Sequence, residues 1–307
     1  MDTRTITCSD GHVLVYRVWI PQKKEIRAVL HIFHGMAEHA SRYDRFATFL
    51  NTHGIAVYAQ DHRGHGDTAL DGELGWFSDE GGWMRVAEDA YELSNLIATE
   101  NPGLQLFLMG HSMGSFLART VMVLHPDLYS GVIIMGTGAA KGMVGKVGMW
   151  LARRHAKKNG SRTPDKAIDK LSFGSFNKKF NPTKTPFDWL SRDEAEVQKY
   201  IDDELCGFVC SSQFFVDLLT GVEFANNKVN AEKLPKDLPL LVISGDMDPV
   251  GDYGKGVRKV YALYRDAGIA DVTLKLIPGG RHELLNETNR DEIQQELYLW
   301  INRRIED

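Results

Sequence analysis

Hydrophobic residues along this 307-residue chain change their spacing as the chain proceeds, and each change predicts a different kind of structure. Residues 3–7 and 12–20 alternate apolar and polar side chains around a Ser-Asp-Gly turn, which predicts a β-hairpin. Short apolar runs and segments of helical period then alternate, the runs at 28–33, 55–60, 104–109 and 131–136 and the helical segments near 40–52, 82–99 and 113–124. This alternation is typical of a mostly parallel sheet with helices on both faces.

The α/β pattern stops at Gly138 and resumes near the C-terminus. Two further strands and two further helices are predicted, the strands at 238–244 and 271–277 and the helices near 253–267 and 289–304. Residues 139–233 have mostly helical spacing and no strand-like repeat. We therefore expect an α/β core, residues 1–138 and 234–307, that carries residues 139–233 as a helical cap over the carboxyl edge of its sheet.

Composition and charge exclude several classes of protein. With 43% hydrophobic and 25% charged residues, the chain is globular rather than disordered. Lys and Arg number 36 against 41 Asp and Glu, so no nucleic-acid partner is expected. No run approaches the roughly 18 to 20 apolar residues of a membrane-spanning helix, and the first residues lack the blocks of a signal peptide. We expect a cytoplasmic protein.

The cysteines do not predict a disulfide framework. There are three, Cys8, Cys206 and Cys210, which is an odd number and agrees with a reducing compartment. Cys206 and Cys210 would share one face of a helix, but no neighbouring Cys or His completes a metal site. Small buried apolar residues are the favoured interpretation, and we expect neither a metal nor a cofactor.

The strongest chemical signal is the run Gly110-His111-Ser112-Met113-Gly114, which fits G-x-S-x-G. It stands after an apolar strand and before an amphipathic helix, which is the context that gives this short motif its meaning. A tight strand-to-helix turn strains the serine backbone and needs small residues on either side. We expect Ser112 to be a nucleophile raised above the sheet edge, with Gly110 and Gly114 making the turn.

A serine hydroxyl needs a general base, and the base needs an orienting carboxylate. In folds with this nucleophile turn, the carboxylate and the histidine follow the serine along the chain. His282 follows the last predicted strand, and Asp246 and Asp248 follow the strand before it. Asp248 precedes Pro249 and is the favoured carboxylate, whereas Asp246 would cap the turn or pair with a cation of the cap.

Acyl transfer also needs donors for the oxyanion. One is the backbone amide of the residue after the nucleophile, here Met113. The second is expected from the loop after the strand at 28–33, where Gly35 permits a sharp turn and the Met36 amide follows it.

Five stretches of the sequence carry a family resemblance. They are HGMAEHASRYDRFATFL, AVYAQDHRGHG, FLMGHSMGS, ISGDMDPVG and GGRHELLNE, between residues 31 and 287. The chain resembles the monoacylglycerol lipase and lysophospholipase group of α/β-hydrolases, also called the serine aminopeptidase S33 type. The resemblance implies an eight-stranded, mostly parallel sheet with an antiparallel N-terminal hairpin and an inserted helical cap. It also implies Ser112, Asp248 and His282 as the catalytic triad and the Met36 and Met113 amides as the oxyanion hole.

The chain departs from that family in two places. The resemblance implies that residues 61–66 form a loop at the floor of the site, but the family usually has serine next, where this chain has Asp67. The cap has no clear match to a characterised member, so the substrate follows only loosely from the family.

We expect a serine hydrolase that cleaves a carboxylic ester of a monoacylated lipid, or a short to medium acyl ester, through an acyl-enzyme intermediate. An amidase or aminopeptidase on the same scaffold is the alternative, and it would need cap carboxylates such as Glu194, Glu196 or Glu204 to bind a substrate amine. A non-catalytic binding protein of the same fold is disfavoured by the intact triad.

Two features of the cap bear on the substrate. Its aromatic residues suit an acyl or aryl pocket or ordinary packing, the candidates being Phe173, Phe176, Trp189 and Phe214. Residues 141–185 hold twelve Lys or Arg against two Asp. A basic amphipathic helix over 141–158 would suit peripheral contact with an anionic membrane, and a solvated cap face is the competing interpretation.

Overall fold

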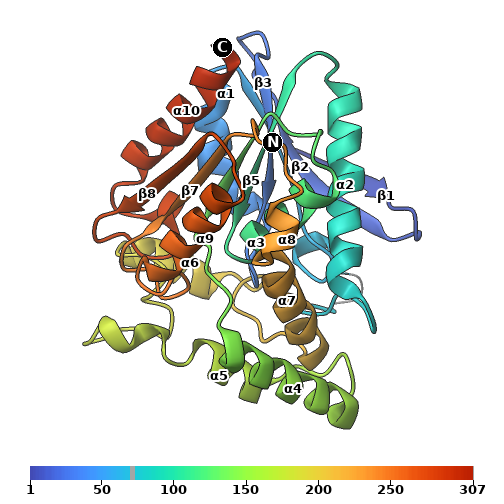
Figure 1. Ribbon diagram of the computed structural model, residues 1–307, viewed down its shortest axis with the longest axis vertical. Helices are drawn as coiled ribbons and strands as arrows, with labels where there is room; N and C mark the ends of the chain where they lie inside the picture. The colour runs from blue at the N-terminus through green and yellow to red at the C-terminus, as the bar shows by residue number, and fades with distance from the viewer. Residues whose placement is uncertain (70–72, 307) are drawn as a thin grey trace.

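An eight-stranded mixed sheet forms the centre of the molecule (Figure 1). The computed structural model describes residues 1–69 and 73–306. The strands are β1 Asp2–Thr7, β2 Val13–Trp19, β3 Ala28–Phe33, β4 Ile55–Gln60, β5 Gln105–His111, β6 Gly131–Met135, β7 Leu240–Gly245 and β8 Val272–Ile277. β1 and β2 coincide closely with the alternating segments of the predicted hairpin, and the other six strands coincide closely with the apolar runs in the sequence.

The strand order is β1-β2-β4-β3-β5-β6-β7-β8. β1 pairs antiparallel with β2, and β2 pairs antiparallel with β4. The remaining pairs are parallel, so the predicted N-terminal hairpin and mostly parallel sheet are confirmed. Phe33 lies opposite Gly110, and His111 lies opposite Met135, so the carboxyl ends of β3, β5 and β6 form one row. The loops that leave these strands therefore meet at one edge.

Helices cover both faces of the sheet, as the alternating pattern predicted. The core helices are α1 Asp44–Asn51, α2 Gly82–Glu100, α3 Met113–Leu124, α9 Lys255–Asp266 and α10 Arg290–Glu306. α1 and α10 pack on one face, and α2, α3 and α9 pack on the other. The segment predicted as a helix over 40–52 begins with a 3-10 turn at Ala40–Tyr43. Within the described residues, every helix is too short or too polar to cross a membrane.

The central strands of the sheet are buried on both sides, which explains their nearly continuous apolar sequences. In β5, Leu106 and Leu108 point into the core beneath α2 and α3, and Phe107 and Met109 point into the core beneath α1 and α10. Consecutive side chains of a strand alternate between faces, so the central strands supply both cores.

Residues 139–233 form helices and irregular segments at the end of the molecule opposite the chain termini (Figure 1). The helices are α4 Gly142–Asn159, α5 Lys166–Phe173, α6 Glu194–Asp202, α7 Ser212–Ala225 and α8 Lys228–Ala231. α7 packs against both α3 and α4, so it lies between the outermost helix and the sheet. A stretch between α5 and α6 has only a short 3-10 turn at Phe176–Lys179, where the sequence pattern had predicted mostly helix.

Arg119 of α3 ties this segment to the rest of the protein. The side chain is fully buried and donates hydrogen bonds to Tyr264 Oη at 2.8 Å and to the Ala225 carbonyl at 2.7 Å. It also donates to the Gly138 carbonyl at 3.3 Å. Gly138 and Ala225 lie near the two ends of the 139–233 segment, so one guanidinium fixes both ends.

Replacing Arg119 with alanine should lower the free energy of unfolding by about 3 kcal/mol or more, because several buried acceptors lose their donor at about 1–3 kcal/mol each. Chemical denaturation of the variant measures this loss. Arg265→Ala is the control, since Arg265 is exposed on α9 and, among the residues that the structure describes, donates one hydrogen bond, to the Ala270 carbonyl. Similar losses in both variants would contradict a fastening role for Arg119.

Candidate active site

Ser112 occupies a strained turn between β5 and α3. Its φ is 53° and its ψ is −118°, a conformation that residues other than glycine rarely adopt. A Cβ atom on Gly110 would lie 2.1 Å from the Gly114 carbonyl oxygen, and one on Gly114 would lie 2.1 Å from the Phe33 carbonyl oxygen. Only glycine fits at either position, which is the reason that the sequence pattern requires it.

His282 and Asp248 form a buried pair. His282 Nδ1 lies 3.0 Å from Asp248 Oδ2, and Asp248 also accepts hydrogen bonds from the Val250 amide and the Ser244 hydroxyl. Burial disfavours the charged carboxylate, but the His282 ring and these hydrogen bonds outweigh burial and hold the pKa of Asp248 below its ordinary value. An ionised Asp248 accepts a hydrogen bond from Nδ1–H of His282, which leaves Nε2 of that ring free to take a proton from a hydroxyl.

Asp246 has a different contact. Its Oδ1 accepts a hydrogen bond from the Gly279 amide at 2.8 Å, which fastens the loop that leads to His282. Of the two carboxylates that the sequence offered, the structure places Asp248 against the His282 ring.

Ser112 and His282 line the same cavity, which has a volume of about 280 Å³. Within the described residues, the Ser112 hydroxyl has no hydrogen-bond partner in this conformation, so it is free to rotate toward His282. Such bonds are often long or absent in enzymes without substrate and form when the substrate binds.

The Gly35–Glu38 loop lies beside the nucleophile. A Cβ atom on Gly35 would lie 3.1 Å from Ser112 Cβ, and Ala37 has a φ of 52°. The Met36 and Met113 amide groups have no hydrogen-bond partner within the part of the chain that the structure describes. Two unpaired N–H donors on residues that line the Ser112 cavities are what an oxyanion hole needs.

A second, mostly apolar cavity of about 840 Å³ also reaches Ser112. It extends beneath α4, with walls that include Phe116, Leu151, Leu218 and Val222. The two cavities share Met36, Ser112, Phe173 and Val250, so they meet at the nucleophile.

The aromatic residues singled out in the sequence are divided between these spaces and the core. Phe173 lines both cavities, Phe176 lines the larger one, and Trp189 lines the smaller one with its ring centroid 5.0 Å from that of His282. Phe214 lines neither of these two cavities. It is fully buried against Phe77, at 4.6 Å between ring centroids, because that face of α7 packs on the core.

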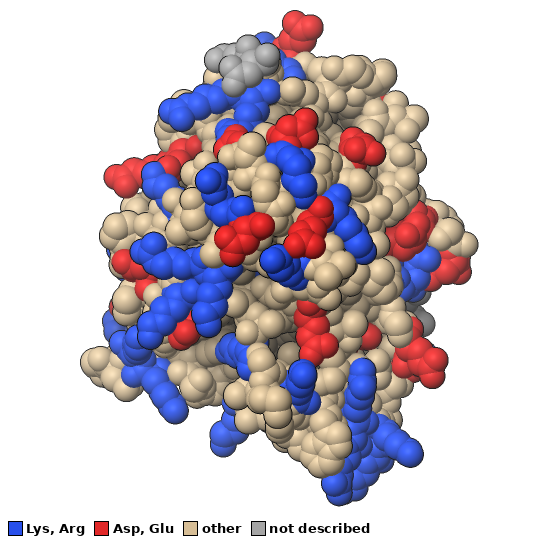
Figure 2. Space-filling model, viewed as in Figure 1, with Lys and Arg blue, Asp and Glu red and all other residues tan. Residues whose placement is uncertain are grey.

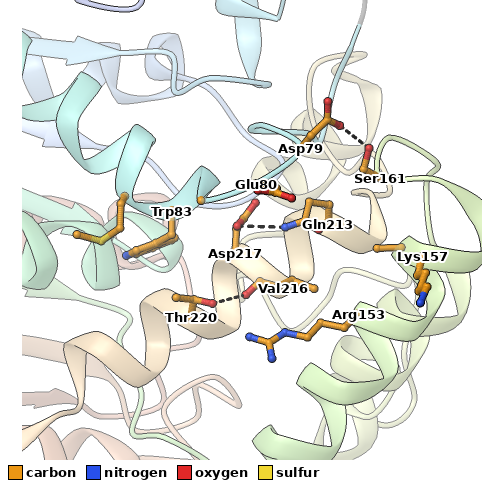
Figure 3. Close-up of a pocket in the computed structure, with 13 residues that line it drawn as sticks. Asp79, Glu80, Trp83, Arg153, Lys157, Ser161, Gln213, Val216, Asp217 and Thr220 are labelled. Carbon is orange, nitrogen blue, oxygen red and sulfur yellow. Dashed lines mark hydrogen bonds between the residues drawn. The ribbon is translucent and has the colours of Figure 1, made fainter.

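A third cavity, of about 490 Å³, lies between α2, α4 and α7 (Figure 3). Asp217 is buried in its wall, and burial raises the pKa of its carboxyl to about 7. Figure 3 shows Asp217 beside Gln213, with Arg153 and Lys157 approaching from α4. Neither Ser112 nor His282 lines this space, so we place the chemistry at the other two cavities.

Asp67, the residue that departs from the family pattern, has a clear partner. Its carboxylate forms an ion pair with Arg17 of β2, and its amide donates to Asp61 Oδ2 at 2.9 Å. The opposite oxygen of Asp61 accepts from the Ala40 amide at 2.8 Å. The substitution therefore adds a charged contact between the 61–66 loop and β2.

Two groups of side chains are close enough to hold a metal ion within the described residues, and neither pairs Cys206 with Cys210. One contains His39, Asp203 and Cys206, and the other contains Cys8, Asp89 and Glu92. Their carboxylates already have protein partners, since Asp203 accepts from His39 at 2.8 Å and Asp89 pairs with an arginine at 2.9 Å. This favours ion pairing at both places.

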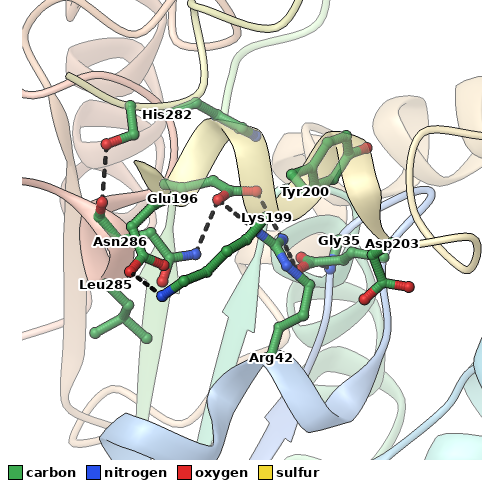
Figure 4. A network of polar contacts seen from close by, with 12 residues as sticks. Gly35, Arg42, Glu196, Lys199, Tyr200, Asp203, His282, Leu285 and Asn286 are labelled. Carbon is green, nitrogen blue, oxygen red and sulfur yellow. Dashed lines mark hydrogen bonds and ion pairs between the residues drawn. The ribbon is translucent and has the colours of Figure 1, made fainter. Parts of the chain in front are cut away.

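One buried polar cluster was not predicted from the sequence. It contains Glu38, Arg42, His111 and Glu283, of which His111 and Glu283 directly adjoin Ser112 and His282 in the chain. Figure 4 shows Arg42 of this cluster with Gly35 and Tyr200 close by. All four residues lie within motifs that carried the family resemblance, and these motifs were the sequence feature that could have identified them. A single sequence does not show that Glu38 contacts His111, 73 positions away, or that Arg42 contacts Glu283, 241 positions away.

Comparison with known proteins agrees with this geometry. The family model for serine aminopeptidase S33 matches residues 24–289. The chain belongs to this family of α/β-hydrolases. Among curated relatives, the human monoglyceride lipase is 28% identical and the alignment covers 96% of this chain and 89% of that protein. The monoacylglycerol lipase of Mycolicibacterium smegmatis is 29% identical, with 95% of this chain and 93% of that protein covered.

Solved structures of similar proteins share the whole fold of this S33 family member. A thermostable carboxyl esterase from Bacillus coagulans, solved with glycerol, superimposes with a TM-score of 0.91 at 30% identity over 99% of this chain and 98% of that one. The monoglyceride lipase of Saccharomyces cerevisiae superimposes with a TM-score of 0.76 at 21% identity over 99% and 94%. The predicted α/β-hydrolase fold is therefore confirmed.

Replacing Asp248 and Asp246 with asparagine, one at a time, tests which carboxylate pairs with His282. Asp248→Asn should lower kcat by about 10⁴-fold, because the amide no longer holds the imidazole in the required tautomer. Asp246→Asn should change kcat far less, since the Asp246 carboxylate accepts from the Gly279 amide of the loop backbone. Steady-state kinetics with a chromogenic ester measures both. Equal losses would remove Asp248 from the assigned role.

Proposed function

We propose that this protein is a serine hydrolase that cleaves carboxylic esters of monoacylated lipids. Ser112 is the nucleophile, His282 the general base and Asp248 the carboxylate that orients it. His282 takes the Ser112 proton as Oγ attacks the ester carbonyl, and the Met36 and Met113 amides stabilise the oxyanion. His282 then protonates the leaving alcohol, and finally activates the water that releases the acid.

The buried His282 and Asp248 pair, beside a strained Ser112 and two unpaired amides, is the observation that carries this proposal. Each group serves one step of acyl transfer, and all of them converge on the junction of the two cavities.

The two cavities suit the two parts of a monoacylated ester. The larger one has mostly apolar walls, so an acyl chain bound there leaves water at a gain of about 0.8 kcal/mol for each buried CH₂. The smaller one also contains polar side chains, including Asp169, Lys170 and Tyr200, which suit the alcohol. The names of the relatives support a monoacylglycerol-type ester, and we extend that substrate class to this chain.

We divide the chain into a core of residues 1–138 and 234–307 and a cap of residues 139–233. The lining of the large cavity supports this division, since one wall comes from α4, α5 and α7 and the other from the loops around Ser112. In this arrangement the cap selects the acyl group and the core performs the reaction.

The aminopeptidase alternative has less support. Glu194, Glu196 and Glu204, the cap carboxylates considered for binding an amine, line neither cavity at Ser112. Glu196 is paired with Arg45 and Lys199 at 3.0 and 2.9 Å, and Glu194 is paired with Lys184 at 2.5 Å. The acidic groups that do line the smaller cavity include Glu38 and Glu283, both of which are paired with Arg42.

Replacing Ser112 with alanine should abolish ester hydrolysis, with a loss of around 10⁶-fold in kcat, because no other group supplies the nucleophile. The measurement uses 4-nitrophenyl esters from acetate to palmitate, 1-monoacylglycerol, lysophosphatidylcholine and an aminoacyl anilide. Wild-type activity should favour the monoacylated lipids and longer acyl chains. Undiminished hydrolysis by the alanine variant would refute the assignment, and cleavage of the anilide alone would favour the aminopeptidase.

We further propose that α4 rests on an anionic lipid surface while substrate enters. The helix exposes Met143, Val144, Val147 and Trp150, with Val144 73% and Trp150 58% accessible. The first three of these residues also line the large cavity. Basic side chains project from the end of the molecule where α4 lies (Figure 2). Exposed apolar residues next to lysines and arginines suit insertion at a membrane interface.

Charge reversal on this helix tests the membrane contact. Replacing Arg153, Arg154, Lys157 and Lys158 with glutamate should weaken binding to phosphatidylserine vesicles, at about 1 kcal/mol for each charge removed near the surface. The control reverses four exposed basic residues of α9, namely Lys255, Arg258, Lys259 and Arg265. Unchanged vesicle sedimentation of the α4 variant, or equal weakening by both variants, would end the proposal.

A further inference from the structure

His111, the residue directly before Ser112, has a hydrogen-bond acceptor at each ring nitrogen. Its Nδ1 lies 3.0 Å from Glu38 Oε1, and its Nε2 lies 3.3 Å from the carbonyl oxygen of His282. A carbonyl oxygen only accepts hydrogen bonds, and so does an ionised carboxylate. A neutral imidazole has a single N–H, so it would leave one of these contacts as a repulsion between two lone pairs. Both contacts are satisfied only when both nitrogens carry a proton.

The charges around His111 lead to the same protonation state. Arg42 donates to Glu38 Oε2 at 2.7 Å and to both oxygens of Glu283 at 2.7 Å (Figure 4). Glu38, Glu283 and His111 are buried, and the Arg42 side chain is almost so. Two carboxylates and one guanidinium leave one negative charge without a counterion, which is costly away from water. A protonated His111 makes the cluster neutral.

The electrostatic surroundings agree with this geometry. Burial opposes a charge on His111, but the hydrogen bond and the charge of Glu38, with help from Glu283, outweigh burial and raise the pKa of His111 above its ordinary value. Burial also opposes the charge on Glu38, yet Arg42 and His111 hold the pKa of Glu38 well below its ordinary value.

The cluster joins the two loops that the reaction needs. Glu38 Oε1 accepts the Gly35 amide at 2.5 Å, which fixes the turn that presents the Met36 amide. His111 holds the backbone of His282, and Glu283, the next residue, is held by Arg42. The oxyanion loop and the loop of the general base are thus fastened to the end of β5, one residue before the nucleophile.

We propose that His111 is a buried imidazolium which, with Glu38, is a positioning group that keeps the oxyanion loop and the His282 loop aligned on Ser112. This rests on the proposed function. Loss of the His111 proton removes the hydrogen bond to one loop, so turnover falls at alkaline pH.

The direction of this pH dependence follows from the groups that face His111. They are Glu38 from the oxyanion loop, Glu283 and His282 from the loop after β8, and Arg42 and His34 further out. Because the folded-state pKa of His111 lies above the ordinary value of 6.5, the hydrogen bonds from its ring to Glu38 and to the His282 carbonyl are both present below that pH. One of these hydrogen bonds is lost as the pH rises through the folded-state pKa.

Nitrogen-15 NMR of the histidine-labelled full chain tests the charge directly. Below pH 6.5 the His111 ring should show two protonated nitrogens, with the signal assigned by its absence in His111→Gln. The signal should change to that of a neutral ring in a titration whose midpoint lies above 6.5. A ring that keeps one unprotonated nitrogen below pH 6.5, or a midpoint below 6.5, would overturn the proposal, whether or not the protein hydrolyses esters.

Glu38→Gln tests the positioning role. Without the carboxylate, the His111 ring should lose its second proton at a lower pH than in the wild type. The kcat should fall roughly 10- to 100-fold with KM little changed, and the alkaline limb of the kcat profile should disappear. Asp89→Asn removes a carboxylate from another buried ion pair, with Arg63, and should leave kcat unchanged. An unaltered pH profile in Glu38→Gln would overturn the role.

These outcomes separate the inference from the proposed function. If wild-type protein hydrolyses no ester, the proposed function fails while the NMR titration still reports the charge of His111. If Ser112→Ala abolishes activity but His111 is neutral, the proposed function stands and the positioning role of a charged His111 fails. Should Glu38→Gln not fold, the wild-type titration and the wild-type alkaline limb decide, since they must share one pKa.

Discussion

The close approach of α3 to the end of β3 is the constraint on which the site depends. A Cβ atom on Gly114 would lie 2.1 Å from the Phe33 carbonyl oxygen, so a side chain at this position would force α3 away from the sheet. With glycine present, the chain turns sharply at Ser112 and α3 begins beside the Gly35–Glu38 loop. The unpaired amides of Met113 and Met36 then border the same hydroxyl, and they come from segments 77 residues apart only because their strands pair in register.

Local constraints made much of this predictable from sequence. The strands buried on both faces read as short apolar runs, and the elbow glycines stand at positions where backbone atoms touch. His282 and Asp248 could be chosen because each follows the carboxyl end of a strand, where parallel strands bring their loops together. The long segment between the two halves of the α/β pattern was predicted from the interruption alone. Its irregular stretch between α5 and α6 was not, because such segments depend on tertiary contacts rather than on periodicity.

What the sequence did not reveal rests on long-range pairing. Phe214 was a candidate for the substrate pocket because helical spacing does not say which face of α7 points to the core. Asp67 was uninterpretable until Arg17 was seen beside it. The cluster of Glu38, Arg42, His111 and Glu283 joins two loops to the end of β5, and its members are charged or titratable residues that composition would assign to the surface. Their burial is explained by mutual neutralisation and by the loops that they hold.

The central claim is that Ser112 attacks an acyl group whose chain lies under α4 and whose oxygen faces two backbone amides. The most direct measurement is a crystal structure after reaction with a long-chain alkyl phosphonofluoridate, in which Ser112 Oγ bonds to phosphorus, fluoride leaves and His282 takes the proton. We predict a phosphonyl oxygen within hydrogen-bond distance of the Met36 and Met113 amides, with the alkyl chain in the apolar cavity. Phosphorus on any other residue, or a phosphonyl oxygen turned away from both amides, would contradict the account.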